Sequence, residues 1–409
     1  MMPKTNNIPE VRFAGFTDAW EQRKLDTITD VRDGTHDSPQ YVETGHPFIT
    51  SKNVKDGFIN YEDIQYVSDK DYEEINKRSK VDKNDILMGM IGTIGNIALV
   101  RETPDFAIKN VALIKDIGDV YYRYLYHCLQ SNSAAHQLDE NLDGGTQKFI
   151  ALNKIRELVI PVPSEHEQHK IGDYMESLDN LITLHQRKYE RLKNVKKSML
   201  EKMFPKNGSN IPEIRFAGFT DAWEQRKLGE LADIVGGGTP STGVSDYWDG
   251  NIDWYAPAEI AEQIYLTSSQ RKITEEGYNH SSAKMLPVGT VLFTSRAGIG
   301  KTAILARKGC TNQGFQSIVP HKGELDSYFI FSRTEELKQY GETVGAGSTF
   351  VEVSGKQMAN MELMMPKTMA EQKTIGQYFA NLDRLITLHQ RKLEKLQNIK
   401  KSMLEKMFV

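Results

Sequence analysis

The chain has 409 residues, of which 39% are hydrophobic and 26% are charged, with a formal net charge of −4, values typical of a folded globular protein of two to three domains. It has neither a signal-peptide pattern nor an apolar run of about twenty residues, so we expect a cytoplasmic protein. Its only cysteines, Cys128 and Cys310, lie in different halves, which fits a reducing compartment and excludes cysteine-based metal clusters.

The first predicted element is a cap segment at residues 8–25, which is repeated almost letter for letter at residues 211–228. Two copies that agree so closely cannot read two different targets. We therefore expect the cap to be a scaffold, with Phe13, Phe16 and Trp20 packing onto the domain and onto the end of a long helix.

Each cap leads into an insert of roughly 140 residues. The first insert contains a turn-rich loop at 33–41, a segment at 48–54 and two short strands around a Gly-Thr-Ile-Gly turn within 85–100. A helix is expected over 120–137, and a polar loop at 144–149 precedes a strand over 158–162.

The second insert matches the first poorly but follows the same order. A loop at 236–242 is followed by a strand-turn-strand segment at 291–302, a polar segment at 311–317 and a helix near 326–340. The sequence thus combines a near-identical scaffold with divergent inserts, and each insert is predicted to be a mixed α/β domain with many short strands.

A long helix follows each insert, within 165–204 and 371–408, and the two copies are about 204 residues apart. Apolar residues recur at helical spacing and no proline interrupts them, which predicts rods ~55 Å long. Because a long apolar stripe on a charged helix needs a partner, we expect the two helices to pair as an antiparallel coiled coil. The residues predicted to form the seam are Leu178, Leu181, Ile182, His185, Leu192, Leu382, Leu385, Ile386, His389 and Leu396.

An alternative is that each helix covers only its own domain. The two copies agree on both helix faces, which favours pairing, since a covering helix needs to match only on its buried face. His185 and His389 occupy equivalent seam positions, and we interpret them as a polar layer that sets the register. A metal site is not expected there because no third ligand is apparent.

These elements divide the chain into a first domain at 1–163, a long helix at 164–205, a second domain at 206–369 and a second long helix at 370–409. The predicted fold is mixed α/β and a pseudo-two-fold tandem repeat, with two domains separated by the paired helices.

Several catalytic or cofactor sites have no support in the sequence. Gly298-Ile299-Gly300-Lys301-Thr302 resembles part of a phosphate-binding loop, but Ser295 stands where the pattern needs glycine. No dinucleotide-binding glycine pattern, metal-ligand spacing or activated nucleophile is present, so we expect no cofactor, no metal and no catalysis in this chain.

The polar loops of the inserts suggest nucleic-acid binding, because they carry donors and acceptors able to contact bases or phosphates. Segment 8–163 has a net charge of −7 and segment 211–366 of −5, so any DNA contact must use local patches and draw positive charge from a partner. The candidate residues are Thr35, His36, Ser38, Lys52, Asn53, Thr93, Asn96, Gln147, Lys148, Ser241, Thr242, Ser295, Arg296, Lys301, Asn312, Gln313 and Gln316.

The layout of insert, long helix, insert, long helix resembles the specificity subunit of Type I restriction-modification systems over essentially the whole chain. Asp33-Gly34-Thr35-His36, Gly237-Gly238-Thr239-Pro240-Ser241 and Thr311-Asn312-Gln313-Gly314-Phe315 look like phrases of its target-recognition domains. The stretch 153–168 looks like the family's junction from domain to helix.

The resemblance implies a non-catalytic, DNA-reading subunit. Each domain would read one half of a bipartite, asymmetric DNA sequence, and the helices would fix the unread gap. Two modification subunits with S-adenosylmethionine and two ATP- and Mg-dependent restriction subunits would be its partners, and one chain with pseudo-two-fold symmetry would offer two equivalent docking faces.

Other classes of protein make different predictions. A coiled-coil interaction scaffold without sequence-specific DNA binding would show no salt-sensitive duplex binding. A self-contained methyltransferase would need a cofactor loop and an Asn/Asp-Pro-Pro-aromatic motif, and neither is found. A dimer of half-subunits is disfavoured because both copies lie in one chain.

Overall fold

A computed structural model describes residues 8–55, 57–145, 148–206, 208–260, 263–296, 298–346 and 352–408. The chain forms two compact units, Met1–Gln186 with Arg391–Val409, and Arg187–Gln390. Helices α5 (Glu165–Lys202) and α11 (Met369–Lys406) each contribute one half to each unit, whereas the sequence prediction treated them as separate segments. Among the described residues, no helix is long and apolar enough to cross a membrane.

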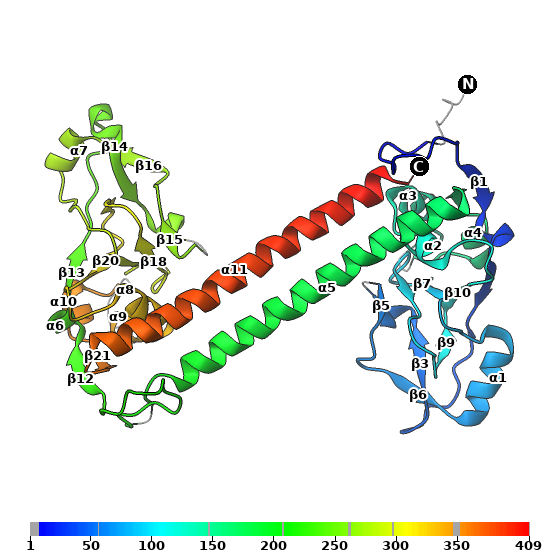
Figure 1. The fold of residues 1–409 in the computed structure, drawn as a ribbon, viewed down its shortest axis with the longest axis horizontal. Coiled ribbons are helices and arrows are strands. Elements are labelled where there is room, and N and C mark those ends of the chain that lie inside the picture. Colours follow the sequence, from blue (N-terminus) through cyan, green and yellow to red (C-terminus); the bar gives the residue numbers. More distant parts are fainter. Residues whose placement is uncertain are drawn as a thin grey trace. The chain divides into compact units, whose positions relative to one another are not determined.

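The first unit is built on an antiparallel sheet in the order β2-β10-β7-β8. Its two central strands, β7 and β10, are labelled in Figure 1. Successive strand side chains point to opposite faces, so Ile86 and Met88 enter one core while Leu87 enters another. Both faces are therefore covered, which explains the continuous apolar runs in the two central strands. The strands are β2 (Asp30–Asp33), β10 (Val111–Lys115), β7 (Ile86–Gly89) and β8 (Ile97–Leu99).

A smaller sheet in the order β6-β3-β9 lies beside it, and its strands β3 and β9 are parallel. Phe48, Val67 and Ala107 pack there against Tyr72 and Ile75 of α1. The remaining elements of this unit are β6 (Gln65–Val67), β3 (His46–Thr50), β9 (Ala107–Lys109), α1 (Asp69–Ser79), η2 (Ser51–Asn53), β4 (Val54–Lys55), β5 (Phe58–Ile59), α2 (Tyr122–Cys128), α3 (Asn132–Glu140) and α4 (Leu152–Arg156).

The second unit repeats this plan with a sheet in the order β13-β20-β17-β18-β15 and a smaller one in the order β16-β14-β19, in which β14 and β19 are parallel. The poor sequence match therefore conceals a shared mixed α/β architecture. Its strands are β13 (Ala232–Gly236), β20 (Gln316–Pro320), β17 (Val291–Phe293), β18 (Thr302–Leu305), β15 (Tyr265–Leu266), β16 (Arg271–Ile273), β14 (Trp248–Tyr255) and β19 (Cys310–Thr311). Its shorter helices are α6 (Leu228–Leu231), η4 (Pro257–Glu259), α7 (Glu275–Asn279), α8 (Ser327–Ser332), α9 (Thr334–Gly345) and α10 (Gly355–Ala359).

The caps are scaffold, as their repetition predicts. In the first unit β1 (Glu21–Lys24) pairs with β11 (Val159–Val162), and Arg12 donates to both oxygens of Glu167, at 2.7 and 2.8 Å. The buried Trp20 indole donates to the same carboxylate at 3.2 Å. In the second unit β12 (Glu224–Lys227) pairs with β21 (Glu362–Met365) in the same way.

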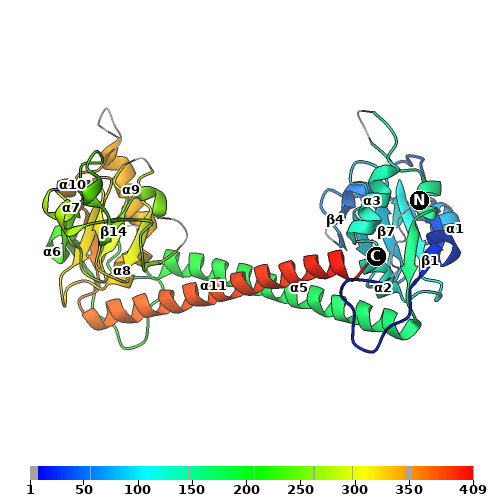
Figure 2. The same ribbon diagram turned by 90° about the horizontal axis from the view of Figure 1, so that it is seen from above.

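Each cap also holds the last turn of a long helix. The Val11 N–H donates to the Lys406 carbonyl at 3.0 Å, and the Ile214 N–H donates to the Lys202 carbonyl at 2.9 Å. The end of α11 lies beside α2 in the first unit (Figure 2), where Phe408 packs against Tyr124 with ring centroids 5.7 Å apart. The cap therefore joins the start of its unit to both long helices.

The two long helices pack against each other within each unit. In the first unit, Ile171, Met175 and Leu178 of α5 share a core with the half-buried Leu396, Ile399 and Met403 of α11. In the second unit, Ile375, Phe379 and Leu382 of α11 share a core with the half-buried Leu192, Val195 and Met199 of α5. Tyr124 contacts both Phe408, near the end of α11, and Gly172, near the start of α5, so the helices run antiparallel there.

The seam differs from the prediction at two residues. Leu181 and Leu385 are 43% and 37% exposed, whereas Leu178 and Leu382 are buried. Consecutive helical residues project about 100° apart, so Leu181 and Ile182 cannot both face the partner. Ile182, His185, Ile386 and His389, which were also predicted for the seam, are half-buried.

Candidate nucleic-acid interface

In the first unit, the loop after β2 lies against the end of β9. The Thr35 N–H donates to the Ile108 carbonyl at 3.1 Å, and the Asn110 N–H donates to the Thr35 carbonyl at 3.2 Å. A Cβ at Gly34 would lie 2.4 Å from the Ile108 oxygen, so this position requires glycine. The close backbone approach places the side chains of the loop beside those of residues 109 and 110.

These side chains form a polar group at the surface. His36, 59% exposed, bridges Asp33 at 2.9 Å and the Asn110 Oδ1 atom at 2.8 Å. Lys109 donates to the exposed Ser38 hydroxyl. Exposed donors and acceptors that now satisfy one another can exchange these bonds for contacts with bases or phosphates.

Lys109 and Asn110 were not among the residues predicted from the sequence. Asn110 has a φ of 52°, in the left-handed region where asparagine is enriched, and its contact with His36 spans 74 residues of chain. A signal for these two residues was present in the second insert, in the polar segment that begins at Thr311. That segment occupies the same place in the second unit as Lys109 and Asn110 do in the first.

The second unit has the same backbone frame with different side chains. The Gly238 N–H donates to the Thr311 carbonyl at 2.8 Å, and a Cβ at Gly237 would lie 2.0 Å from the Asn312 oxygen. Thr239 then donates to the Gln313 carboxamide. Thr239 and Gln313 therefore occupy the positions that His36 and Asn110 occupy in the first unit.

Two tryptophans fix this loop of the second unit. The Trp254 indole donates to the Gly238 carbonyl at 2.8 Å and the Trp248 indole to the Ser241 carbonyl at 3.1 Å. The Arg271 guanidinium lies 3.7 Å from the Trp248 ring centroid, a cation–π contact that supports the indole from behind. Ser241 and Thr242 are exposed on the loop so held.

The strand-turn-strand segments are also equivalent. Gly89 and Asn96 close the turn of the first unit through an N–H to carbonyl bond of 2.8 Å, and Thr294 and Lys301 close that of the second at 3.0 Å. In the first unit, Thr93 donates to the Ser51 carbonyl and the Ser51 hydroxyl donates to the Asn110 carbonyl, both at 2.5 Å. Hydrogen bonds through the buried Ser51 therefore connect the turn, η2 and the Thr35–Asn110 region.

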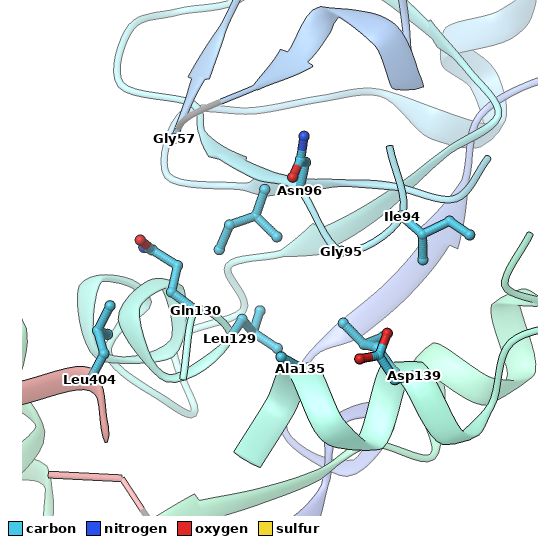
Figure 3. A pocket seen from close by; sticks show the side chains of 11 residues that line it. Gly57, Ile94, Gly95, Asn96, Leu129, Gln130, Ala135, Asp139 and Leu404 are labelled. Atoms are coloured by element: carbon cyan, nitrogen blue, oxygen red, sulfur yellow. The ribbon is translucent and has the colours of Figure 1, made fainter. Parts of the chain in front are cut away.

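The turn of the first unit borders a pocket of about 350 Å³ (Figure 3). Gly95 and Asn96 line it on one side, Gln130 and Asp139 on another, and Leu404 of α11 contributes from the helix end. Asn96 and the end of α11 therefore border the same pocket in this unit.

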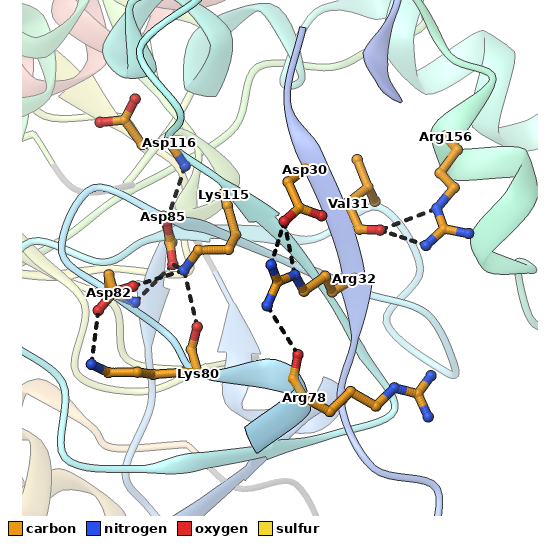
Figure 4. A network of polar contacts seen from close by, with 10 residues as sticks. All are labelled: Asp30, Val31, Arg32, Arg78, Lys80, Asp82, Asp85, Lys115, Asp116 and Arg156. Carbon is orange, nitrogen blue, oxygen red and sulfur yellow. Dashed lines mark hydrogen bonds and ion pairs between the residues drawn. The ribbon is translucent and has the colours of Figure 1, made fainter. Parts of the chain in front are cut away.

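A network of ion pairs and hydrogen bonds holds β2, the strand from which the loop at residues 33–41 departs (Figure 4). Lys115 donates to Asp82 and Asp85, at 2.9 Å each, and the hydrogen bond from Lys115 holds the pKa of Asp82 below its usual value. Arg32 donates to Asp30 at 2.6 and 2.8 Å, and Arg156 donates to the Val31 carbonyl at 2.7 and 3.1 Å. Strand β2, from which the loop departs, is thereby held on both sides.

Two predicted contact residues are buried. Asn53 is 2% exposed, and its side chain accepts from the Thr50 N–H at 3.0 Å and donates to the Asn60 carbonyl at 3.0 Å. Ser295 is fully buried in the second unit. Both predictions are corrected, because each side chain is enclosed by the fold and cannot meet DNA.

The other predicted residues are partly or fully accessible, with one exception. Lys52, Lys148 and Lys301 are exposed, and Thr93, Asn96, Arg296, Asn312 and Gln316 are half-buried. The Asn312 side chain accepts from the Gly314 N–H at 2.8 Å, which shapes the turn. Gln147 lies outside the described residues.

Comparisons with known proteins agree with this geometry. The chain matches the family described as Type I restriction modification DNA specificity domain over residues 17–194 and again over 220–398. The MjaIX specificity subunit of a type I restriction enzyme from Methanocaldococcus jannaschii is 36% identical over 165 residues, which is 39% of this chain and 38% of that relative. The putative MjaX specificity subunit of the same organism is 25% identical over 418 residues, 98% of this chain and 95% of that one.

Among solved structures, the S subunit of the Type I restriction-modification system from M. genitalium has a TM-score of 0.66 at 15% identity and covers 98% of this chain and 99% of that one. This likeness shows a shared fold. Since two copies of the matched domain account for most of its length, the chain belongs to the Type I restriction modification DNA specificity family.

Proposed function

We propose that this chain is the DNA-reading subunit of a Type I restriction-modification complex, and that each unit reads one half of a bipartite, asymmetric DNA sequence. One observation carries this proposal. The same backbone frame presents His36 and Asn110 in the first unit but Thr239 and Gln313 in the second. A constant frame with different donors and acceptors is what two different half-sites require.

The chemistry of these side chains suits readout of base edges in the major groove. Asparagine and glutamine can bind adenine through two hydrogen bonds, and histidine, serine and threonine donate or accept at either base edges or phosphates. Lys109 and Lys52 place positive charge at the first loop, within a segment whose net charge is −7.

We further propose that the chain is non-catalytic and that two modification subunits dock on it. Tyr174, Leu181 and Leu184 expose apolar surface on α5 in the first unit, and Leu385 and Leu388 do so at the equivalent positions of α11 in the second. Two similar apolar faces fit two copies of one partner. S-adenosylmethionine would come with those subunits, and ATP and Mg²⁺ with two restriction subunits.

The proposed reading of DNA sequence is tested in cells that make this chain with its modification partner. Long-read sequencing of their DNA maps the methylated sites. The His36→Ala/Asn110→Ala variant should relax one half of the methylated sequence and leave the other unchanged. The Thr239→Ala/Gln313→Ala variant is the matched counterpart and should relax only the other half. Methylation of the same sequence by the parent and by both variants would exclude these residues from base reading.

A further inference from the structure

Three potential metal ligands meet where α2 packs against α5 in the first unit. His127 lies in the last turn of α2, and Glu176 and Asp179 lie three residues apart on one face of α5. One ligand atom from each of the three side chains lies within 4.8 Å of the others. We propose that His127, Glu176 and Asp179 bind a divalent transition-metal ion such as Zn²⁺.

Two polar atoms of this group are buried without hydrogen bonds. His127 is fully buried and its Nε2 atom has no hydrogen-bond partner, and the Glu176 Oε2 atom has none either. The other ring nitrogen, Nδ1, contacts the Gln130 side-chain nitrogen at 3.5 Å, which leaves Nε2 for an ion. Buried polar atoms are rarely left unpaired in folded proteins. A bound cation would satisfy Nε2 and would give Oε2 a closer partner than the Arg101 guanidinium, which lies 3.6 Å from that same oxygen.

Two cations already border the group, and neither blocks it. The Lys400 Nζ atom lies 2.6 Å from Oδ1 of Asp179, so the second oxygen of that carboxylate remains available as a ligand. Arg101 lies 3.6 Å from Glu176, but it also donates to the Gly57 carbonyl at 3.2 Å and covers the Phe58 ring at 5.0 Å. Arg101 therefore stays in place without Glu176. Both cations should weaken, but not prevent, binding of a further positive ion.

The ligand set selects the class of metal. An imidazole nitrogen with two carboxylates suits Zn²⁺ and neighbouring transition metals, whereas Mg²⁺ and Ca²⁺ prefer oxygen ligands alone. No metal was predicted from the sequence, because His127 and the two carboxylates are separated by about fifty residues of chain. Only the packing of α2 on α5 brings them together.

The second unit lacks this site and so serves as an internal control. At the structurally equivalent positions it has Ser332, Ala380 and Asp383, since Phe329 packs on Phe204 as Tyr124 packs on Phe408. The Asp383 carboxylate accepts from the Tyr328 hydroxyl at 2.9 Å. One ion per chain is therefore expected. It would link α2 to α5 and stabilise the first unit by mass action.

Calorimetric titration of the full chain with Zn²⁺ after EDTA treatment, together with thermal unfolding, tests the site. We expect one ion per chain and a higher unfolding temperature with Zn²⁺, but no such shift with Mg²⁺ at the same concentration. The His127→Ser/Glu176→Ala variant copies the second unit and should weaken binding more than about 100-fold, and the isosteric Glu176→Gln about tenfold.

The neighbouring lysines give a matched pair of further variants. Lys400→Met removes a positive charge next to the ligands and should tighten Zn²⁺ binding, whereas the equivalent Lys196→Met of the second unit should not change it. Absence of Zn²⁺ binding by the parent chain would overturn the proposal. So would unchanged binding by Glu176→Gln, or equal effects of the two lysine variants.

Discussion

Lys400 and Asp179 form an ion pair of 2.6 Å between α11 and α5 in the first unit, and Lys196 and Asp383, each 204 residues away, form one of 2.6 Å in the second. The duplication thus repeats an interaction between helices as well as a sequence. The end of each helix completes the core beside the start of the other, since Phe408 packs on Tyr124 and Phe204 packs on Phe329. The near identity of the repeated segments follows, because both copies must fit the same kind of junction.

The buried carboxylates at the caps should each support one unit. Glu167 is 1% exposed and holds Arg12 and Trp20, so Glu167→Ala should lower the free energy of unfolding of the first unit by about 3–5 kcal/mol, because the Arg12 charge is left unpaired. Glu371→Ala should act equally on the second unit, where Glu371 pairs with Arg215 and Trp223. Urea denaturation monitored by hydrogen exchange measures the loss in free energy of unfolding separately for each unit. A loss below about 1 kcal/mol in either would contradict the role given to these residues.

Substitutions of the adjacent residues Lys52 and Asn53 should affect different properties, DNA binding for Lys52 and stability for Asn53. Lys52 is exposed, so Lys52→Ala should leave stability unchanged and reduce the salt dependence of DNA binding by about one phosphate contact. Asn53→Ala should cost about 1–3 kcal/mol of stability, because the Thr50 N–H and the Asn60 carbonyl lose a buried partner. Binding to one duplex over a range of salt concentrations, with thermal unfolding of both variants, separates the two. Equal salt slopes for Lys52→Ala and the parent would remove Lys52 from the interface.

The sequence predicted the architecture well because the signals for it are local. Each of these signals, namely helical spacing, the repeated cap and the turn glycines, depends on residues that are near one another in the chain. The sequence therefore predicted the two long helices, the caps and the strand-turn-strand segments. The site was predicted less completely because it depends on distant pairing. His36 was identified, but Asn110 meets it only because the loop after β2 pairs with the end of β9, Thr35 opposite Lys109. Asn53 and Ser295 look like other polar loop residues, and only tertiary packing shows that they are buried.

His321 should titrate above its ordinary range. Its hydrogen bond to Asp233, 3.1 Å long, raises the pKa of the imidazole above about 6.5. The pair therefore contributes its full stability below pH ~6.5 and loses it as pH rises through the raised pKa of the folded state. Histidine NMR of the full chain, with His321→Gln for assignment, measures this pKa, and Asp233→Asn should lower it. An unchanged pKa in Asp233→Asn would show that the pair has no effect.

The exposed leucines of the long helices should control how many modification subunits bind. Leu184 and Leu388 are 46% and 44% exposed at equivalent positions, so Leu184→Gln or Leu388→Gln should reduce the bound modification subunits from two to one, and the double variant should bind none. Native mass spectrometry of reconstituted complexes counts them. Val288→Gln changes an exposed apolar residue that is not on either long helix and should retain both. Two subunits on the double variant would place docking elsewhere.

Shortening both long helices should change the unread gap without changing what is read. Seven residues make two helical turns and about 10.5 Å of length, equal to about 3 base pairs of B-DNA. Removing 185–191 from α5 and the equivalent 389–395 from α11 keeps the seven-residue period of the apolar face and retains Leu184 and Leu388. Each half-site should therefore be retained with a gap shorter by about that amount. Removing only one segment breaks the equivalence of the Lys400–Asp179 and Lys196–Asp383 pairs and should abolish methylation. Methylation mapping distinguishes these results, and altered half-sites with an unchanged gap would show that the helices do not set the spacing.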